Sequence, residues 1–280
     1  MDKETEKKLK LYAARMRKLI IEGIYQAQSG HPGGSLSCTD IFAYLYGEKM
    51  NVDPANPDMP DRDRFVLSKG HCAPALYSAL GLRGFFPTEQ VATLRHCGSI
   101  LQGHPCMTHI PGVDMSTGSL GQGISAAVGM AMAGKLDNKT YRVYSILGDG
   151  ELQEGQVWEA FMAAAHYKLD NLTAFIDNNG LQIDGPNDQV MSLGSIPAKL
   201  AAFGWHVIEI DGHDFTSIEA AVAEAETVKG QPTVVVAKTH KGMGVSFMKD
   251  QAGWHGAAPK KEQYEQAMEE IDAAIAAVEG

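Results

Sequence analysis

The spacing of hydrophobic residues predicts a long helix near the start of the chain. Between residues 5 and 28, apolar side chains recur every three or four positions, which is the pattern of a helix with one buried face. Ser29 and Gly30 interrupt this pattern, so we expect His31 to begin a loop directly after the helix. Residues 51–64 contain three prolines and four aspartates, which predicts an ordered surface loop.

The middle of the chain predicts a β-α-β unit. Two short runs rich in β-forming residues, 141–147 and 171–176, flank a segment whose apolar face predicts a helix to about Tyr167. Strands joined in this way are expected to be parallel. Further elements are expected as a helix at 196–203, a strand at 205–210, a helix at 215–228, a buried strand at 233–239 and a terminal helix at 260–278.

No repeat or linker divides the chain. The pattern therefore predicts one doubly wound α/β domain over residues 1–280, with a mostly parallel sheet and helices on both faces.

Composition and charge indicate which kinds of partner and which cellular compartment to expect. Hydrophobic residues make up 44% of the chain and charged residues 21%, which is typical of a globular protein. The net charge of −10 disfavours nucleic acid and anionic membranes as partners. The four cysteines form no C-x-x-C pair, and the polar N-terminus does not resemble a secretory signal. We therefore expect a cytoplasmic protein.

Polar residues follow both predicted strands of the β-α-β unit. Asp149 stands between Gly148 and Gly150 after the first strand, and Asn179 follows the second strand 30 residues later. Ligands of parallel sheets bind at the carboxyl ends of the strands, and carboxylate and amide oxygens suit Mg²⁺ or Ca²⁺. A helix N-terminus after Asp149 would favour an anion. Either tripeptide alone would be an ordinary turn, but together they predict a site for a metal-bound diphosphate.

Two nucleotide-binding motifs are excluded. Residues 129–135 have the spacing of a phosphate-binding P-loop, but Leu136 stands where Ser or Thr is required, and the preceding segment predicts a helix. The dinucleotide fingerprint that would begin at Gly148 fails because Gln153 occupies its last glycine position.

Eight further strings stand out along nearly the whole chain. They are SGHPGGSLS (29–37), LSKGHCAPALY (67–77), GHP (103–105), STGSLGQGISAAVGMA (116–131), GDGELQEGQVWEA (148–160), DNNGLQIDG (177–185), KTHKGMGVSFM (238–248) and WHGAAP (254–259). In content and in order they resemble the N-terminal, thiamine diphosphate-binding domain of transketolase, and residues 148–179 resemble the thiamine diphosphate signature of that family.

The resemblance implies a role for individual residues. The implied metal ligands are Asp149, Asn179 and the main-chain carbonyl of Leu181. The implied cofactor-binding residues are His71, Gly118, Leu120, Gly150, Glu154, Asn179, Lys241 and His255. The implied catalytic residues are His31, His71, His104 and His255. The first three match the histidines that surround the reacting carbons of the donor sugar, and His255 matches a position near the diphosphate and the reaction centre. Clustered imidazoles suit such a reaction because protons move at several neighbouring oxygens.

The chain stops at Gly280, where a usual transketolase continues into a pyrimidine-binding domain and a C-terminal domain. The resemblance therefore implies one subunit of a split transketolase of the pentose phosphate pathway, active only with a separate partner, as an α₂β₂ heterotetramer. The partner would supply the glutamate that activates the cofactor. Xylulose 5-phosphate is the default donor, while a branched-sugar phosphate or a sulfonated sugar fits this half equally well.

Three other interpretations remain open. The thiamine-binding subunit of a 2-oxo acid dehydrogenase also carries Gly-Asp-Gly and Asn-Asn, although the histidine segments argue against it. 1-Deoxyxylulose-5-phosphate synthase is related in fold. A non-catalytic regulatory subunit could retain the cofactor fold. All the implied metal ligands and donor-site histidines are present, however, and a subunit without activity would be expected to lose such costly buried polar residues first.

Overall fold

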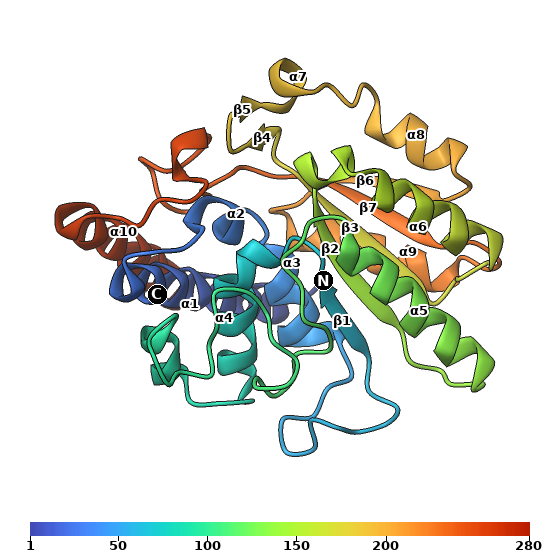
Figure 1. The fold of residues 1–280 in the computed structure, drawn as a ribbon. Coiled ribbons are helices and arrows are strands. Elements are labelled where there is room, and N and C mark those ends of the chain that lie inside the picture. Colours follow the sequence, from blue (N-terminus) through green and yellow to red (C-terminus); the bar gives the residue numbers. More distant parts are fainter.

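The computed structural model describes residues 1–280 and contains a five-stranded parallel sheet (Figure 1). The strands lie in the order β1-β2-β3-β7-β6. Their bounds are Arg64–Leu67 for β1, Val143–Gly148 for β2, Leu172–Asn178 for β3, His206–Asp211 for β6 and Thr233–Lys238 for β7. A separate antiparallel pair consists of β4 (Leu181–Gln182) and β5 (Gly185–Pro186).

Ten α-helices accompany these strands, and the helices predicted from the sequence are all present. Short 3₁₀ or π segments lie between some of them. The bounds of the helices are α1 Lys3–Ala27, α2 Pro32–Ser37, α3 Thr39–Tyr44, α4 Ala73–Arg83, α5 Gln122–Leu136, α6 Gly155–His166, α7 Asn187–Val190, α8 Ile196–Ala202, α9 Phe215–Thr227 and α10 Lys261–Glu279.

Helices cover both faces of the sheet, which confirms the predicted doubly wound α/β class. Side chains of a strand point alternately to opposite faces. Tyr144 and Ile146 of β2 therefore lie in the larger core with α1, α3, α4 and α9, whereas Val143 and Leu147 lie in the smaller core with α5, α6 and α8. Figure 1 shows α5 and α6 side by side on that second face, with α1 and α10 together at the far side of the molecule.

The β-α-β unit is confirmed, but its surroundings differ from the sequence-based expectation. β2 pairs with β3 in parallel, and the helix between them begins only at Gly155, because residues 150–153 form a 3₁₀ turn. The strand expected at 205–210 is β6, which lies at the sheet edge beyond β7 and is partly exposed. β1 begins at Arg64, inside the segment predicted as a loop, because its backbone pairs with β2.

The five parallel strands bring their carboxyl ends to one edge of the sheet. Four of these ends lead into the segments 68–72, 149–154, 179–183 and 239–242. None of the helices combines the length and apolar character needed to cross a membrane.

Candidate active site

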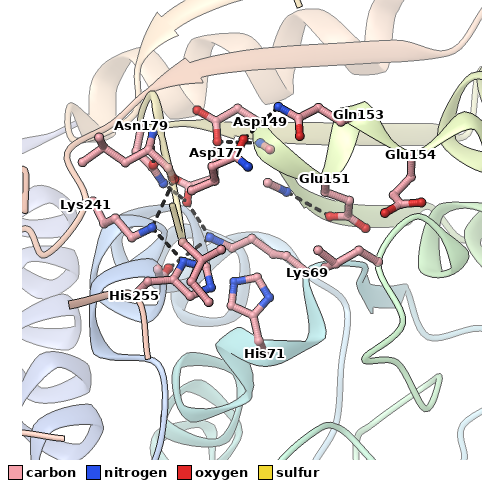
Figure 2. A pocket seen from close by; sticks show the side chains of 17 residues that line it. Lys69, His71, Asp149, Glu151, Gln153, Glu154, Asp177, Asn179, Lys241 and His255 are labelled. Atoms are coloured by element: carbon pink, nitrogen blue, oxygen red, sulfur yellow. Dashed lines mark hydrogen bonds and ion pairs between the residues drawn. The ribbon is translucent and has the colours of Figure 1, made fainter. Parts of the chain in front are cut away.

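A cavity of about 230 Å³ opens at this edge of the sheet (Figure 2). Its walls bring together segments that are up to 221 residues apart in the chain, from Gly34 to His255. Nine residues singled out in the sequence line it, namely His71, Leu120, Asp149, Gly150, Glu154, Asn179, Leu181, Lys241 and His255. His31, His104 and Gly118 do not line this cavity and lie beside it.

Asp149 is buried at the end of β2 and is joined to the end of β3. Its carboxylate accepts hydrogen bonds from the N–H of Gly150, at 2.8 Å, and from the N–H of Gly180, beside Asn179. Burial, reinforced by the negative charge of Asp177, raises the pKa of Asp149 to about 6. The structure thus brings Asp149 to the Asn179 turn, as the β-α-β spacing predicted.

The turn after β3 presents the other two implied metal ligands. The side-chain oxygen of Asn179 accepts a hydrogen bond from the N–H of Leu181 at 3.0 Å, and the carbonyl of Leu181 faces the ammonium group of Lys241 at 3.1 Å. A carboxylate, an amide oxygen and a main-chain carbonyl form the hard oxygen set that Mg²⁺ and Ca²⁺ prefer. Because burial and the negative charge of Asp177 disfavour the charged form of Asp149, a cation bound by this carboxylate would stabilise it. These residues therefore fit a divalent cation.

A buried ion pair lies beneath the cavity and was not predicted from the sequence. Asp177 is 0% exposed and accepts hydrogen bonds from Lys69, Ser37, Thr239 and Asn179. Burial disfavours the charge of Lys69, yet attraction to Asp177 outweighs it and holds the pKa of the lysine well above its usual range. Both residues lie at the ends of strands, inside strings that resemble transketolase. This position was the only feature of the sequence that could have pointed to them as site residues.

Lys241 also lines the cavity. Its ammonium group also lies 2.9 Å from Nδ1 of His255. Burial lowers the pKa of Lys241 to about 8. Hydrogen bonds to the preceding residue fix the loop that carries Lys241. The N–H of His240 donates to Nε2 of His213, and Nδ1 of His213 lies 2.7 Å from the carboxylate of Asp40.

Four of the histidines singled out in the sequence form one cluster beside the cavity. The ring centroid of His31 lies 5.1 Å from that of His71, 5.6 Å from that of His255 and 6.5 Å from that of His104, and the rings of His71 and His255 lie 5.2 Å apart. Burial lowers the pKa of His31 to about 4 and that of His255 to about 3. Burial also lowers the pKa of His104. These three imidazoles are therefore neutral at physiological pH and can each donate or accept a proton.

Gly118 supports this cluster from outside the cavity. A Cβ atom at Gly118 would lie 3.0 Å from the ring of His104, which is tighter than an ordinary contact. The backbone of the 116–121 segment can therefore approach the imidazole only because this residue has no side chain.

Comparison with known proteins agrees with this site. Residues 9–274 match the family described as the thiamine diphosphate binding domain of transketolase. The chain belongs to this family. The match covers the cavity, the cation-ligand set and the histidine cluster together.

Two relatives of similar length are themselves named as transketolase subunits. The chain is 45% identical to a subunit of the apulose-4-phosphate transketolase of Phocaeicola vulgatus, over 97% of this chain and 96% of that protein. It is 46% identical to a subunit of the 6-deoxy-6-sulfo-D-fructose transketolase of a Clostridium species, over 92% of this chain and 94% of that protein.

The chain also resembles the first part of longer transketolases. It is 42% identical to human transketolase, over 96% of this chain and 43% of the human protein. The crystal structure of Campylobacter jejuni transketolase superposes with a TM-score of 0.90 at 31% identity, covering 99% of this chain and 46% of that one. These relatives favour transketolase over the 2-oxo acid dehydrogenase interpretation.

Proposed function

We propose that this chain is the N-terminal subunit of a two-component transketolase. It transfers a two-carbon ketol unit from a ketose phosphate to an aldose phosphate, with thiamine diphosphate and a divalent cation as cofactors. The observation that carries this proposal is the cluster of four imidazoles beside a cavity lined with oxygen ligands and lysines. The near-complete coverage of relatives named as subunits supports the two-component organisation.

The residues around the cavity would have two roles in holding the cofactor, namely binding the cation and balancing the charge of the diphosphate. Asp149, Asn179 and the Leu181 carbonyl would hold Mg²⁺ or Ca²⁺. The ammonium group of Lys241 lines the same cavity and would balance part of the charge of a diphosphate. When bound, thiamine diphosphate supplies the nucleophilic carbon that attacks a ketose carbonyl.

The histidine cluster would handle the protons of the sugar. His31, His104 and His255 are neutral, so each can accept a proton from one hydroxyl group and donate a proton to a neighbouring oxygen. Nδ1 of His31 is buried and has no hydrogen-bond partner. A buried polar atom of this kind normally has a partner, and a sugar hydroxyl would provide one.

The partner is proposed as a C-terminal transketolase subunit that carries the pyrimidine-binding domain, in a cytoplasmic α₂β₂ heterotetramer. The two relatives named as subunits belong, by their names, to an apulose-4-phosphate transketolase and to a 6-deoxy-6-sulfo-D-fructose transketolase. Xylulose 5-phosphate is the first donor to test, followed by apulose 4-phosphate and 6-deoxy-6-sulfofructose.

The test is a ketol-transfer assay with thiamine diphosphate and Mg²⁺. Xylulose 5-phosphate is the donor and ribose 5-phosphate the acceptor, and the chain is assayed alone and with the C-terminal half of a transketolase, ideally one encoded beside it. Activity only in the mixture supports the proposal. Full activity of the chain alone contradicts the two-component organisation.

If the mixture binds cofactor but does not transfer a ketol unit from xylulose 5-phosphate, the two other donors are assayed next. Activity with one of them assigns the substrate. A mixture that neither binds thiamine diphosphate nor acts on any of the three donors contradicts the proposed function.

A further inference from the structure

Glu151 is a buried carboxylate for which the proposed chemistry has no use. It lies on the 3₁₀ turn directly after Gly150, and only 2% of its surface is exposed. Figure 2 shows its side chain turned back below the turn, away from Lys241 and His255. Isolated carboxylates are rarely buried, so its hydrogen-bond partners indicate what it does.

Both carboxylate oxygens of Glu151 accept hydrogen bonds. One oxygen accepts from the hydroxyl of Ser68, at 2.5 Å, and from the N–H of Gly121, at 2.9 Å. The other oxygen accepts from the N–H of Gly148 at 3.0 Å. The Ser68 hydroxyl in turn accepts from the N–H of Ile124, in the first turn of α5, at 3.2 Å.

The three donors belong to three separate segments that border the cavity. Ser68 follows β1 and precedes Lys69, Gly121 follows Leu120, and Gly148 precedes Asp149. No backbone hydrogen bond joins Gly121 to the 148–151 segment. The Glu151 side chain therefore connects Gly121 to the turn after β2, a connection that no backbone hydrogen bond makes.

We propose that Glu151 is a positioning residue that fixes the 116–121 segment and the Gly148–Gly150 turn relative to each other before the cofactor binds. The expected effect on cofactor binding rests on the proposed function, because these two segments carry Leu120 and Asp149, which line the cavity. The geometric part of the assignment, the locking of two backbone segments, holds for the chain without any ligand.

The substitution Glu151→Gln separates this role from simple packing. Glutamine has nearly the same shape, but its amide nitrogen donates and cannot accept. Whichever way the amide is turned, either the N–H of Gly121 or the N–H of Gly148 faces another donor. A buried N–H without an acceptor is strongly unfavourable, so that segment is expected to move away.

The first measurement is amide hydrogen exchange of the chain without cofactor. In Glu151→Gln, we expect exchange at Gly121 or Gly148 to be at least tenfold faster, while buried amides of β3 such as Phe175 keep their protection. Ser68→Ala, which leaves both backbone bonds to Glu151 in place, is expected to change exchange at these two glycines by less than threefold. Glu269→Gln, the same change at an exposed site on α10, serves as the matched control.

The second measurement is the affinity for thiamine diphosphate with Mg²⁺, by calorimetric titration in the presence of the partner. Glu151→Gln is expected to weaken binding at least tenfold, and Glu269→Gln is expected to leave it unchanged. Unchanged exchange at both glycines would overturn the assignment. A loss of protection throughout β3, or failure to fold, would also overturn it, because Glu151 would then be a general structural residue.

The exchange result does not depend on the proposed function. If the wild-type mixture binds no thiamine diphosphate, the proposed function fails while exchange at Gly121 and Gly148 still tests the positioning role. If binding is normal in Glu151→Gln despite faster exchange, the positioning role toward the cofactor fails and the proposed function stands.

Discussion

The two sides of the cavity are built on opposite electrostatic principles. On the sheet side, Asp177 and Lys69 are charged, fully buried and saturated with hydrogen bonds. In the histidine cluster beside the cavity, three of the four imidazoles are neutral, and Nδ1 of His31 has no partner. A network whose bonds are already made resists movement, whereas an unpaired polar atom remains available to a ligand. The comparison indicates a rigid floor for the cofactor and an adaptable wall for the sugar.

The largest expected effect comes from removing the carboxylate of the rigid side. Asp149→Ala deletes the only charged ligand that the chain itself offers the proposed cation, so metal-dependent binding of thiamine diphosphate should fall by roughly 100-fold or more. Calorimetric titration with and without Mg²⁺ measures this effect. Asp137→Ala, at an exposed position at the end of α5, is the control. Wild-type affinity in Asp149→Ala would show that the cation is held elsewhere.

Breaking the buried ion pair should affect folding as well as binding. Lys69→Met leaves Asp177 charged in a site with 0% exposure, and an uncompensated buried charge costs about 3 kcal/mol or more. Urea unfolding of the cofactor-free chain measures the loss. Adding Asp177→Leu should restore part of the stability, because the second charge is then gone. If Lys69→Met is as stable as the wild type, the description of a rigid, saturated floor is wrong.

The histidine side should respond in the opposite way. His31→Phe removes an imidazole whose Nδ1 makes no bond in the folded chain, so stability should change little. Ketol transfer in the complete complex should fall roughly 100-fold, which is typical for loss of a positioned acid–base group. Steady-state kinetics and thermal unfolding provide the two readouts. A variant that loses stability but keeps kcat/KM would assign His31 to the fold instead of the reaction.

The smallest expected effect is a pH dependence of stability. The pKa of His31 is lowered to about 4 in the folded chain, below its value of 6.5 in the unfolded chain, so the unfolded state binds more protons between these pH values. The contribution of His31 to stability should therefore decrease as pH falls from about 6.5 to 4. The pKa of Asp149 is raised to about 6, and its contribution changes with the opposite sign.

The contribution of His31 can be separated from that of Asp149 by comparing the wild type with a variant that lacks the His31 imidazole. Urea unfolding of the wild type and of His31→Phe at several pH values should give a stability difference that shifts in favour of the variant as the pH falls. His166→Phe, at an exposed position at the end of α6, should show no such trend. A difference that is independent of pH would mean that His31 is not buried as a neutral imidazole.

Much of this architecture follows from local patterns. The hydrophobic period identifies α1, α6 and α9, and the β-prone runs identify β2, β3 and β7 within one or two residues. The distance of one crossover between Asp149 and Asn179 predicts that both lie at the same rim, because parallel strands end at one edge of the sheet. These properties are visible in the sequence because they depend on residues that are close together in the chain.

Other features were decided by tertiary packing alone. β1 and the edge position of β6 depend on pairing with distant strands. The ion pair between Lys69 and Asp177 joins residues 108 positions apart. Nothing in the sequence around either residue indicates that the two would pair. The contacts among His31, His71, His104 and His255 span most of the chain, so the resemblance could name these residues, but only the folded sheet brings their rings to about 5 to 6.5 Å. Local periodicity determines which elements form, whereas the burial of charge and the meeting of distant side chains are settled only when those elements pack.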